Sequence, residues 1–482
     1  MRNSPVARAQ FSTRPISSRR SRPDTILPNR RLAARSAVRR GPAIKPIASA
    51  SLWLAVYLAL IVAPVLVLLL EPTPHGGGFW WDFALVLGYA ALAMMGLQFW
   101  LTARFKRATA PFGIDIIYYF HRYLATIACL LLLLHASLQL ALYPDAVGGI
   151  DPRAAPGYMT MGWIALLVFA VLIASSLWRK RLGIEYGRWR RWHGMLAVTG
   201  VVLGLLHVEG SGSYLTSPLK RWLWGALALS WIGLIVWVRV LRPWRLRQQP
   251  YRVVDVRQEP GRSWTLSLQP EHPPAFDYRP GQFAWVSLRA SPFALREHPF
   301  SISSSPTRPG PLQFTIKALG DFTATVGQIG IGEIAYVDGP YGIFGIDAHP
   351  HATGFVFVAG GVGIAPIVSM LRALADRGDR RPLWLFYGNR RWDRVVFRED
   401  LDALRTQLDL RLVHVLSEPP EGWPGEHGFI DLAVMQRHLP TESTGLHFLV
   451  CGPDPMIRLV ERNLEALGVP LRQLHSEIFD LA

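Results

Sequence analysis

The stretch of sequence that decides the fold extends from Ile114 to Leu142 and reads IDIIYYFHRYLATIACLLLLLHASLQLAL. It is apolar enough to cross a membrane, yet it contains two histidines, His121 and His135, which lie 14 positions apart. That number of helical residues rises about 21 Å and falls only about 40° short of four full turns. We therefore expect both imidazoles on one face of a helix, one near each side of the membrane.

A second apolar run, Trp192–Val208, carries His193 and His207 at the same spacing. If both helices cross in the same direction, His121 lies level with His193, and His135 lies level with His207. Two facing imidazoles can hold a haem iron from both sides, and the core of a helical bundle is a usual place for such a cofactor. The pattern predicts two b-type haems stacked across the membrane. Because both axial positions are filled, electrons would transfer at the haem edge.

The four histidines have two other possible roles, as hydrogen-bonding groups between helices or as a proton path. Ionisable side chains inside a membrane are costly and are functional candidates by default. One histidine alone would fit these alternatives, but two pairs at identical spacing favour metal ligation. The expected iron ligands are His121, His135, His193 and His207.

Six apolar runs are long enough to cross a hydrocarbon core of about 30 Å, which takes roughly 20 helical residues. They are Ile47–Leu70, Phe79–Leu101, Ile114–Leu142, Met159–Trp178, Trp192–Val208 and Trp222–Leu241. The chain is 50% hydrophobic, and many of its 18 tryptophans lie at the edges of these runs, where interfacial aromatic residues belong. We therefore expect a six-helix transmembrane bundle in a lipid bilayer.

The formal net charge of +17 is concentrated in the N-terminal tail and in alternate short loops. The basic loops contain Arg104, Lys106 and Arg107; Arg179, Lys180, Arg181, Arg188, Arg190 and Arg191; and Arg239, Arg242, Arg245 and Arg247. By the positive-inside rule, these loops, both termini and the soluble half are cytoplasmic. The expected location is a bacterial-type plasma (inner) membrane, crossed several times, with an organelle as the open alternative. A folded basic face with base-reading residues is not evident, which argues against nucleic acid as a partner.

Residues 1–46 form a basic tail with eleven arginines, one lysine and one acid. We expect a disordered cytoplasmic extension that is attracted to anionic lipid. A cleaved organelle-targeting peptide has a similar composition and is the alternative. The only two cysteines, Cys129 and Cys451, exclude a disulfide framework and cysteine-based zinc or iron–sulfur sites.

After Pro243 the sequence changes to short alternating apolar stretches between Pro/Gly turns, which predict a small antiparallel β-barrel. These stretches are Arg252–Val256, Thr265–Leu268, Phe283–Leu288 and Leu312–Lys317. From Thr353 onward, apolar strands alternate with helical patterns, which predicts βαβ units and a parallel sheet. The expected strands are Phe355–Val358, Pro382–Tyr387, Arg411–Val415 and Phe448–Cys451, and helices are expected from Pro366, over Val395–Leu408 and over Pro455–Leu467.

The predicted fold is therefore that of a multi-domain membrane protein, in which a six-helix transmembrane bundle precedes an antiparallel β-barrel and an α/β nucleotide-binding domain. The expected parts are the tail (1–46), the six-span haem-binding domain (47–242), the barrel (248–350) and the nucleotide-binding domain (353–482).

Several short motifs follow one another in the soluble half. They are Arg279-Pro280-Gly281-Gln282-Phe283, Arg296-Glu297-His298-Pro299-Phe300-Ser301-Ile302-Ser303, Lys317-Ala318-Leu319-Gly320-Asp321-Phe322-Thr323, Asp338-Gly339-Pro340-Tyr341-Gly342, Gly360-Gly361-Val362-Gly363-Ile364-Ala365-Pro366 and Cys451-Gly452-Pro453. In this order they resemble the flavoprotein half of ferric reductases and NADPH oxidases, which is itself similar to ferredoxin–NADP reductase. With the four-histidine helices before it, the resemblance covers about residues 47–482.

The resemblance implies an FAD site in the barrel. In that family the His-Pro-Phe-Ser/Thr stretch lies along the flavin, which places His298, Pro299, Phe300 and Ser301 against the isoalloxazine and the nearby ribityl chain. The Gly-Asp-Phe-Thr turn with Gly320 would offer Thr323 and backbone N–H groups to the pyrophosphate. The motifs that begin at Arg279 and Lys317 place these two cations in the same FAD site.

The glycine run after Phe355–Val358 leads into a helix with Pro366 near its first turn, a favoured place for proline. Glycines let the backbone approach a phosphate, and a helix N-terminus presents N–H groups to it. The spacing is not the usual dinucleotide fingerprint. By resemblance, Gly360, Gly361, Gly363 and Pro366 bind NAD(P)H, and Cys451, Gly452 and Pro453 lie beside the nicotinamide.

Two features of the nucleotide-binding domain leave alternatives open. Arg390 and Arg391 follow an expected strand where the family binds the adenosine end, and a cation there favours NADPH over NADH; a solvated basic turn is the alternative. Phe479 fits the near-terminal aromatic residue that covers the flavin in the family, although three residues follow it; it could instead anchor the last strand. Cys451 and Phe479 are the residues expected at the hydride-transfer site.

The sequence thus predicts an NAD(P)H-dependent flavohaem oxidoreductase that transfers electrons from NAD(P)H through FAD and two haems to an acceptor on the outer face. The expected acceptor is small, either O2, giving superoxide, or a ferric or cupric chelate, because the outer loops are short. One alternative is an electron-delivery module for a partner protein on the outer face. The other is a soluble-type reductase that is anchored by a haem-free bundle.

Overall fold

The computed structural model describes most of the chain after the N-terminal tail. The described residues are 46–70, 78–105, 114–148, 151, 153, 155–212, 215, 217–272, 276–294, 296–440 and 443–478. The predictions for the tail (1–46) and for Phe479 therefore concern residues almost wholly outside the described chain.

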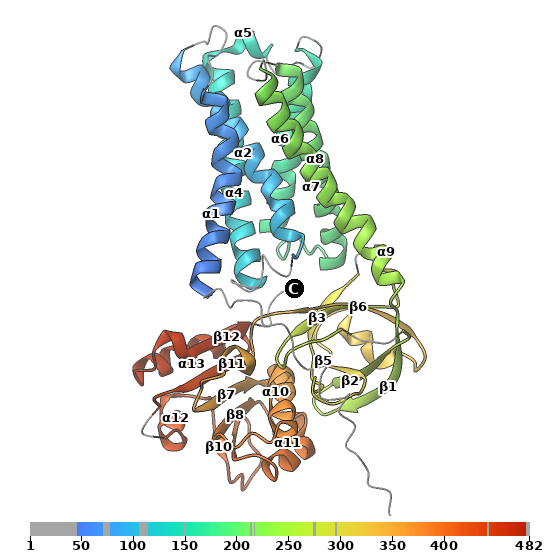
Figure 1. Ribbon diagram of the computed structural model, residues 1–482, viewed down its shortest axis with the longest axis vertical. Coiled ribbons are helices and arrows are strands. Elements are labelled where there is room, and N and C mark those ends of the chain that lie inside the picture. Colours follow the sequence, from blue (N-terminus) through green and yellow to red (C-terminus); the bar gives the residue numbers. More distant parts are fainter. Residues whose placement is uncertain are drawn as a thin grey trace, which may run out of the picture. The chain divides into compact units, whose positions relative to one another are not determined.

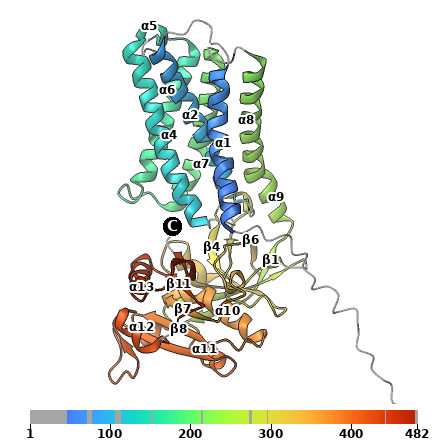
Figure 2. The ribbon, with the colours of Figure 1, turned by 60° about the vertical axis from the view of Figure 1, so that its left-hand side comes forward.

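The first half of the described chain consists of helices. They are α1 (Pro46–Leu70), α2 (Phe79–Thr102), α4 (Ile114–Leu142), α5 (Pro144–Val147), α6 (Gly157–Leu177), α7 (Tyr186–Ser211) and α8 (Pro218–Val236), and α8 continues through a π-helical turn, η1 (Trp237–Leu241), into α9 (Arg242–Arg247). Figure 1 shows the long helices side by side, and Figure 2 shows the same arrangement from another direction.

Five of these helices, among the described residues, are long and apolar enough to cross a membrane. They are Phe79–Thr102, Ile116–Leu142, Gly157–Leu177, Tyr186–Ser211 and Pro218–Arg247. The first predicted span corresponds to α1, whose described apolar part, Ser51–Val67, is shorter. Many apolar side chains on these helices are exposed, among them Leu130, Leu167 and Leu229 at 60%, 64% and 70%, as expected where a helix meets lipid.

The bundle is organised around two close helix pairs. Helix α2 packs along α4, and α6 packs along α7. Helices α2 and α8 also come close together, at Gly96 of α2. Only glycine fits at this position, because a Cβ there would clash with the ring of Trp231 in α8 at 2.0 Å. Small residues at such points let transmembrane helices pack by van der Waals contact, which is needed where no hydrophobic effect drives association.

The second part of the chain forms an antiparallel sheet with the strand order β4-β3-β6-β1-β2-β5. The strands are β1 (Tyr251–Glu259), β2 (Ser263–Pro270), β3 (Phe283–Leu288), β4 (His298–Ser301), β5 (Leu312–Lys317) and β6 (Ile334–Tyr341). A bridge between Ile302, which follows β4, and Phe314 of β5 joins the two edges of the sheet, which therefore curls into a barrel. Inward residues such as Val253, Leu266 and Phe314 are fully buried.

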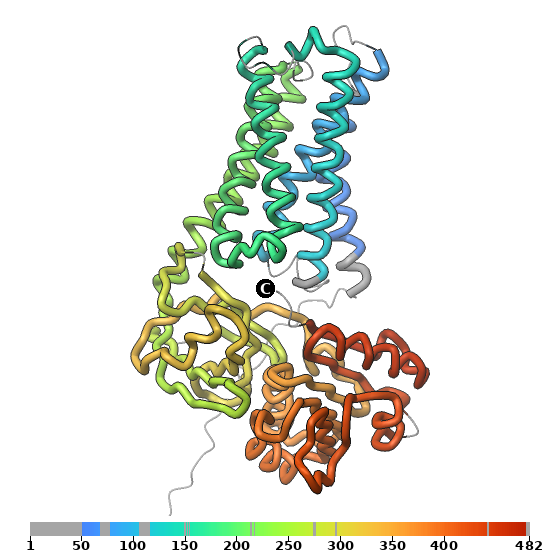
Figure 3. Tube along the Cα trace, turned by 180° about the vertical axis from the view of Figure 1, so that it is seen from behind, coloured from blue at the N-terminus to red at the C-terminus, as the bar shows by residue number. Residues whose placement is uncertain are grey.

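The third part is a parallel sheet with the order β10-β9-β8-β7-β11-β12. The strands are β7 (Gly354–Gly360), β8 (Leu383–Asn389), β9 (Leu410–Leu416), β10 (Glu426–His427), β11 (Leu446–Gly452) and β12 (Leu474–Ile478), and the helices are α10 (Ile364–Asp376), α11 (Arg398–Arg405), α12 (Leu432–His438) and α13 (Asp454–Ala466). Helices α10 and α11 cover one face, and α12 and α13 cover the other. Figure 3 follows this part of the trace from β7 to α13.

The predicted fold class is confirmed, with differences in detail. Helix α4 has the predicted bounds, whereas α7 starts six residues before Trp192, at Tyr186. The helix expected over Val395–Leu408 is only α11, because Phe397 adopts a left-handed backbone with φ 60° and the helix starts after it. The sequence analysis did not predict β4, β6, β10 or α12.

Candidate functional site

The four histidines of the bundle lie in two facing pairs. The ring centroids of His121 on α4 and His193 on α7 are 6.2 Å apart, and those of His135 and His207 are 6.5 Å apart. One metal ion between two imidazoles requires two metal–nitrogen bonds of about 2 Å plus about 1.1 Å from each nitrogen to its ring centre, or roughly 6.2 Å. The distances in both pairs fit a single iron held from two sides.

The outer pair, His135 and His207, has its ring orientation fixed by the backbone. The Nδ1 atom of His135 lies 2.7 Å from the carbonyl oxygen of Ala84, and that of His207 lies 2.9 Å from the carbonyl oxygen of Tyr158. A carbonyl can only accept, so Nδ1–H donates in both rings. The lone pair is then on Nε2, which is the arrangement that a metal-ligating histidine requires.

A glycine stands one helical turn after each of these carbonyl residues. A Cβ on Gly88 would lie 3.0 Å from the ring of His135, and a Cβ on Gly162 would lie 2.7 Å from Nδ1 of His207. Each glycine therefore leaves the space that the histidine ring occupies against the neighbouring helix. An apolar cavity surrounds this pair, and its lining includes Leu132, Trp163 and Phe169.

The inner pair, His121 and His193, has a different environment. Ser176 donates its hydroxyl hydrogen to the carbonyl oxygen of Leu172 at 2.6 Å, so its oxygen accepts from Nδ1 of His193 at 3.2 Å. The Nδ1 atom of His121 is buried and has no hydrogen-bond partner among the described residues. The two pairs therefore differ in how strongly the protein orients their rings.

The motif expected along the flavin forms β4, which pairs with β3. The ring of His298 stacks on Phe322, with centroids 3.9 Å apart and planes within 8°. This contact brings together two motifs that the sequence analysis treated separately, and Phe322 itself was not predicted as a site residue. Burial and, after it, the nearby Arg190 lower the pKa of His298 to about 4, so this imidazole is neutral at neutral pH.

The turn expected at the pyrophosphate is a compact hydrogen-bonded unit. The hydroxyl of Thr323 accepts from the backbone N–H groups of Leu319 and Gly320 at 3.0 and 2.8 Å, and it donates to the carbonyl oxygen of Gly320. Thr323 begins a 3-10 helix, η3 (Thr323–Gln328). The hydroxyl thus shapes the turn itself, which leaves other groups of the turn to meet a phosphate.

The glycine run lies where the parallel sheet meets α10. Gly360 ends β7, and Gly361 adopts φ +54°, a left-handed conformation suited to glycine. A Cβ on Gly360 would lie 2.8 Å from Pro453, and one on Gly363 would lie 2.3 Å from the carbonyl oxygen of Cys451. Two predicted motifs that are far apart in sequence are therefore in contact, because β7 and β11 are parallel neighbours.

Three other predicted residues have clear positions. Pro366 lies in the first turn of α10. The ammonium of Lys317, at the end of β5, would lie 3.8 Å from a Cβ on Gly361, so it stands beside the glycine run. Arg279 is exposed, and its backbone N–H donates to the side chain of Gln282 in the turn before β3.

The two arginines at the end of β8 are already paired with acids. Arg390 Nε donates to Glu418 at 2.7 Å, and Arg391 pairs with Asp393 at 2.7 Å. All four side chains are about half exposed or more. The sequence analysis considered Arg390 without Glu418, which follows β9 and lies beside it only because β8 and β9 are neighbours.

A cluster of largely buried ions was not predicted from the sequence. We call it the arginine cluster, and it consists of Arg104, Arg190 and Arg242 with Glu297 and Asp338. Arg104 and Arg190 contact the same oxygen of Glu297 at 2.7 and 2.6 Å, and Arg242 pairs with Asp338. The three arginines come from three separate basic segments, directly after α2, in the first turns of α7 and at the start of α9, and the two acids come from the barrel. The available signal was an arginine in every basic loop and an acid directly before His298.

Arg104 occupies its place at some backbone cost. It follows α2 with φ 57°, a left-handed conformation that non-glycine residues rarely adopt. Its guanidinium lies 3.7 Å from the ring centroid of Trp285 in β3, as well as on Glu297. Burial alone would raise the pKa of Glu297, but Arg104, Arg190 and Arg242 hold that pKa well below its ordinary value. The cluster therefore keeps its charges at neutral pH.

Taken together, a glycine turn at the edge of a parallel sheet, an antiparallel barrel and an apolar helical bundle define a membrane-embedded nicotinamide–flavin oxidoreductase. The family comparisons agree with this class. Residues 87–204 match the family described as "Ferric reductase like transmembrane component", residues 251–343 match "FAD-binding domain", and residues 357–462 match "Oxidoreductase NAD-binding domain". This is the domain order of a fusion of the ferric reductase/NADPH oxidase type.

Individual relatives each match part of the chain. NADH-cytochrome b5 reductase 1 of Kluyveromyces lactis is 30% identical over 167 residues, which are 33% of this chain and 59% of that protein. The reductase component of propane 2-monooxygenase of Mycolicibacterium goodii is 31% identical over 224 residues, 45% of this chain and 63% of that protein. The cytochrome b5 reductase domain of Ulva prolifera nitrate reductase has a TM-score of 0.43 at 19% identity and covers 48% of this chain and 98% of that domain. The chain thus spans less than two thirds of the length of these curated relatives.

The glycine beside the outer histidine pair can be tested with Gly162→Val. The new side chain would overlap the ring of His207, so we expect the haem content of the purified protein to fall from about two to about one per chain. The measurement is the pyridine haemochrome assay normalised to protein. The matched control is Gly225→Val in α8, where nothing lies within 4 Å of the position of a Cβ. Equal haem content in the two variants would contradict the geometry described above.

The arginine cluster can be tested with Glu297→Gln. Removing a buried acid from three arginines costs on the order of 3 kcal/mol. We expect the melting temperature in detergent to fall by several degrees, measured by intrinsic fluorescence. A carboxylate whose pKa is lowered by folding stabilises the folded state at every pH above its ordinary pKa of about 4.3. That stability is lost only as the pH falls through the lowered pKa of the folded state. The difference from wild type should therefore be constant between pH 5 and 8. Glu333→Gln, which removes an exposed partner of Arg289, is the control.

Proposed function

We propose that the protein transfers electrons from NAD(P)H, through FAD and two b-type haems, across the membrane to a small acceptor on the outer face. The observation that carries the proposal is the spacing of the two histidine pairs, each of which fits one iron between α4 and α7. The matches to FAD- and NAD-binding domains in the same chain supply the electron source. The acceptor we propose is O2 or a ferric or cupric chelate.

When bound, the flavin would supply acceptance of hydride and release of single electrons, and the haems would supply one-electron transfer. The protein supplies ligands and surroundings. His121 and His193 would hold the inner haem, and His135 and His207 would hold the outer one, with Nε2 directed to the iron where Nδ1 donates to the protein. With both axial positions filled by imidazole, neither iron would offer an open site to the acceptor.

The flavin site would be built by β4 and the turn before η3. We place the isoalloxazine along β4, which consists of His298, Pro299, Phe300 and Ser301. The neutral His298 adds no charge there. Lys317 lies beside the glycine run and is the cation available to a dinucleotide phosphate. Burial, followed by the nearby Arg394, lowers the pKa of Lys317 from its ordinary value, and a bound phosphate would favour its charged form.

The nicotinamide site would lie where the glycine run meets Cys451, Gly452 and Pro453. Cys451 is completely buried at the end of β11, so its contribution would be the shape of the pocket floor. We place Phe479 over the flavin by resemblance, because it directly follows β12. We assign the domains to residues 47–242, 248–350 and 353–482.

We propose that both termini and the nucleotide-binding parts are cytoplasmic, in a plasma (inner) membrane. Three basic loops support this orientation, since Arg104, Arg190 and Arg242 all contact the barrel and must share one side with it. On the opposite side, the links from α4 to α6 and from α7 to α8 are short. Short outer links suit a small acceptor that approaches the edge of the outer haem.

The electron path is tested by His135→Ala, compared with wild type in anaerobic stopped-flow absorbance after NADPH is added. We expect wild type to show bleaching of the flavin and then growth of reduced low-spin haem bands from about two haems per chain. The variant should reduce its flavin within about twofold of the wild-type rate but lose transfer to an impermeant ferric chelate in proteoliposomes. His272→Ala, an exposed barrel histidine, is the control. Full transmembrane activity in His135→Ala would refute the proposed path.

The choice between NADPH and NADH is tested at the pair Arg390 and Glu418. A carboxylate repels the 2′-phosphate of NADPH but can accept a hydrogen bond from the 2′-hydroxyl of NADH. The arginine attracts the 2′-phosphate and so favours NADPH. We expect Glu418→Gln to raise the ratio of kcat/KM for NADPH over NADH by about 3- to 10-fold and Arg390→Ala to lower it by a similar factor. Steady-state flavin reduction with each nucleotide gives the ratio. If neither variant changes it, the adenosine end does not bind at this turn.

A further inference from the structure

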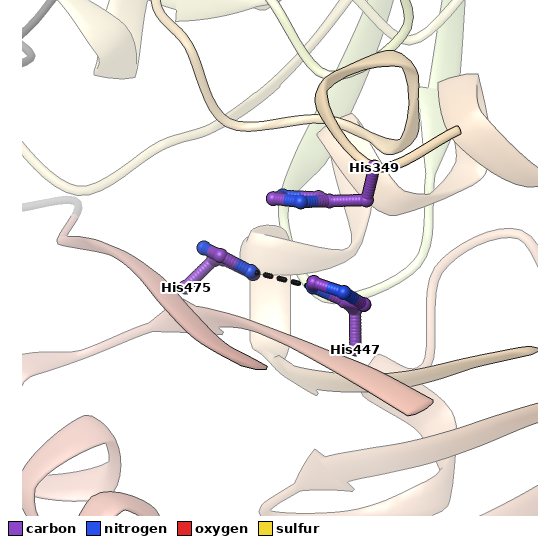
Figure 4. A group of neighbouring side chains, drawn as sticks. All are labelled: His349, His447 and His475. Carbon is purple, nitrogen blue, oxygen red and sulfur yellow. Dashed lines mark hydrogen bonds between the residues drawn. The ribbon is translucent and has the colours of Figure 1, made fainter. Parts of the chain in front are cut away.

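Three histidines gather in the nucleotide-binding part of the chain, away from the haem ligands. His349 follows the short 3-10 helix η4 (Ile346–Ala348), His447 lies in β11, and His475 lies in β12. Each histidine offers one ring nitrogen, and these three nitrogens all lie within 4.8 Å of one another. Figure 4 shows the three rings facing one another from three separate segments. The functional sites proposed above do not use them.

Strand geometry explains why two of these side chains meet. In parallel neighbours, residues in register point to the same side, and His475 is in register with Leu449. Leu449 is two residues after His447, so it shares a face with that histidine. Both imidazoles therefore lie on the same face of the sheet as α10, which covers a neighbouring part of that face. His349 reaches this face from the segment between β6 and β7.

The three rings are close-packed and linked by one hydrogen bond. Nδ1 of His447 and Nε2 of His475 are 3.0 Å apart, and the ring of His349 stacks on both, at 4.2 Å from His447 and 4.0 Å from His475. All three residues are partly exposed. Solvent and a small ion therefore have access to the cluster.

We propose that His349, His447 and His475 bind one divalent transition-metal ion of the kind that prefers imidazole, such as Zn²⁺. Four-coordinate zinc with bonds of about 2.0–2.1 Å holds its nitrogen ligands roughly 3.3 Å apart. The hydrogen-bonded nitrogen pair, at 3.0 Å, is already close to that separation. The third nitrogen lies within 4.8 Å of its neighbours and has to move by at most about 1.5 Å, which side-chain torsions of a partly exposed histidine allow. The fourth position would be held by water.

The protonation state of the cluster suits a metal ion. Burial, and after it the neighbouring imidazoles, lower the pKa of His475 to about 3, and the same two causes lower the pKa of His349 to about 4. Burial also lowers the pKa of His447. All three imidazoles are therefore neutral at neutral pH, which is the state that binds metal. The metal ion would not have to compete with a proton for the ring nitrogens.

The ion would add a direct link between segments that also share a hydrophobic core, which includes Ile346 of η4 and Leu449 of β11. It would tie β12, the last described strand, and β11 to the segment that leaves the barrel through η4. The same face of β11 continues from His447 to Cys451, about 13 Å further along at ~3.3 Å per residue. The site therefore lies at the opposite end of the strand from the proposed nicotinamide pocket, and we assign it a structural rather than a catalytic role.

The experiment uses full-length protein in detergent, purified without a histidine tag, stripped with a chelator and dialysed against buffered free Zn²⁺. Zinc is the probe because it is redox-inert and cannot accept electrons from the protein. Elemental analysis should give about one zinc per chain for wild type. His349→Ala, His447→Ala and His475→Ala should each weaken binding by at least ~100-fold, since loss of a direct ligand exceeds the effect of its supporting partners.

The matched control is His351→Ala, an exposed histidine two residues from His349, which should bind zinc as wild type does. Flavin content reports whether each variant is folded, and His349→Ala changes only a loop if a strand variant fails to fold. Bound zinc should also raise the melting temperature of wild type and not that of His349→Ala. Wild-type zinc binding in all three variants, or no stoichiometric zinc in wild type, would overturn the proposal and leave a metal-free stack of neutral imidazoles.

Discussion

The geometry of the membrane half depends on one kind of contact, that of two facing imidazole rings, whose centroids lie 6.2 Å apart at one level of α4 and α7 and 6.5 Å apart at the other. To hold the outer rings there, α4 and α7 must each lie against a helix whose backbone can accept from Nδ1. Helices α2 and α6 meet this demand in the same way, with a carbonyl at Ala84 or Tyr158 and a glycine one turn later. The close pairs α2–α4 and α6–α7 thus form two similar units, each with a histidine ring packed against a carbonyl and a glycine of the neighbouring helix.

The arginine cluster links the membrane half to the barrel through ion pairs whose desolvation is costly. Buried ion pairs gain little net stability, because desolvation offsets most of the Coulomb attraction, but removing one partner is costly. Glu297 contacts three arginines from three separate segments of the membrane half, so loss of this one acid would remove a counter-charge from three largely buried cations at once. Since Glu297 directly precedes His298, the same contact positions the strand along which we place the flavin.

The helical spans and the common spacing of the four histidines could be predicted from the sequence because both depend only on local periodicity. A run such as Ile114–Leu142 needs no tertiary information to be recognised, and a spacing of 14 is a property of one helix. Contacts between distant segments were not accessible in this way. The pairing of Arg390 with Glu418, the stack of His298 on Phe322 and the cluster around His349 each require strands or loops that only the folded topology brings together. The helix expected over Val395–Leu408 was predicted too long at its start because one residue, Phe397, takes a left-handed backbone that nothing in the sequence indicates.

The choice of arginine at three loop positions follows from the same contacts. The positive-inside rule counts lysine and arginine alike, so orientation alone would be satisfied by either residue. Arg104 must pair with Glu297 and lie flat on the ring of Trp285 at once, and Arg190 contacts both the side chain and the carbonyl oxygen of Glu297. A planar guanidinium with several donors can make such double contacts, whereas a lysine ammonium is a single point charge. The loop arginines therefore serve two physical demands, and the second explains the residue type.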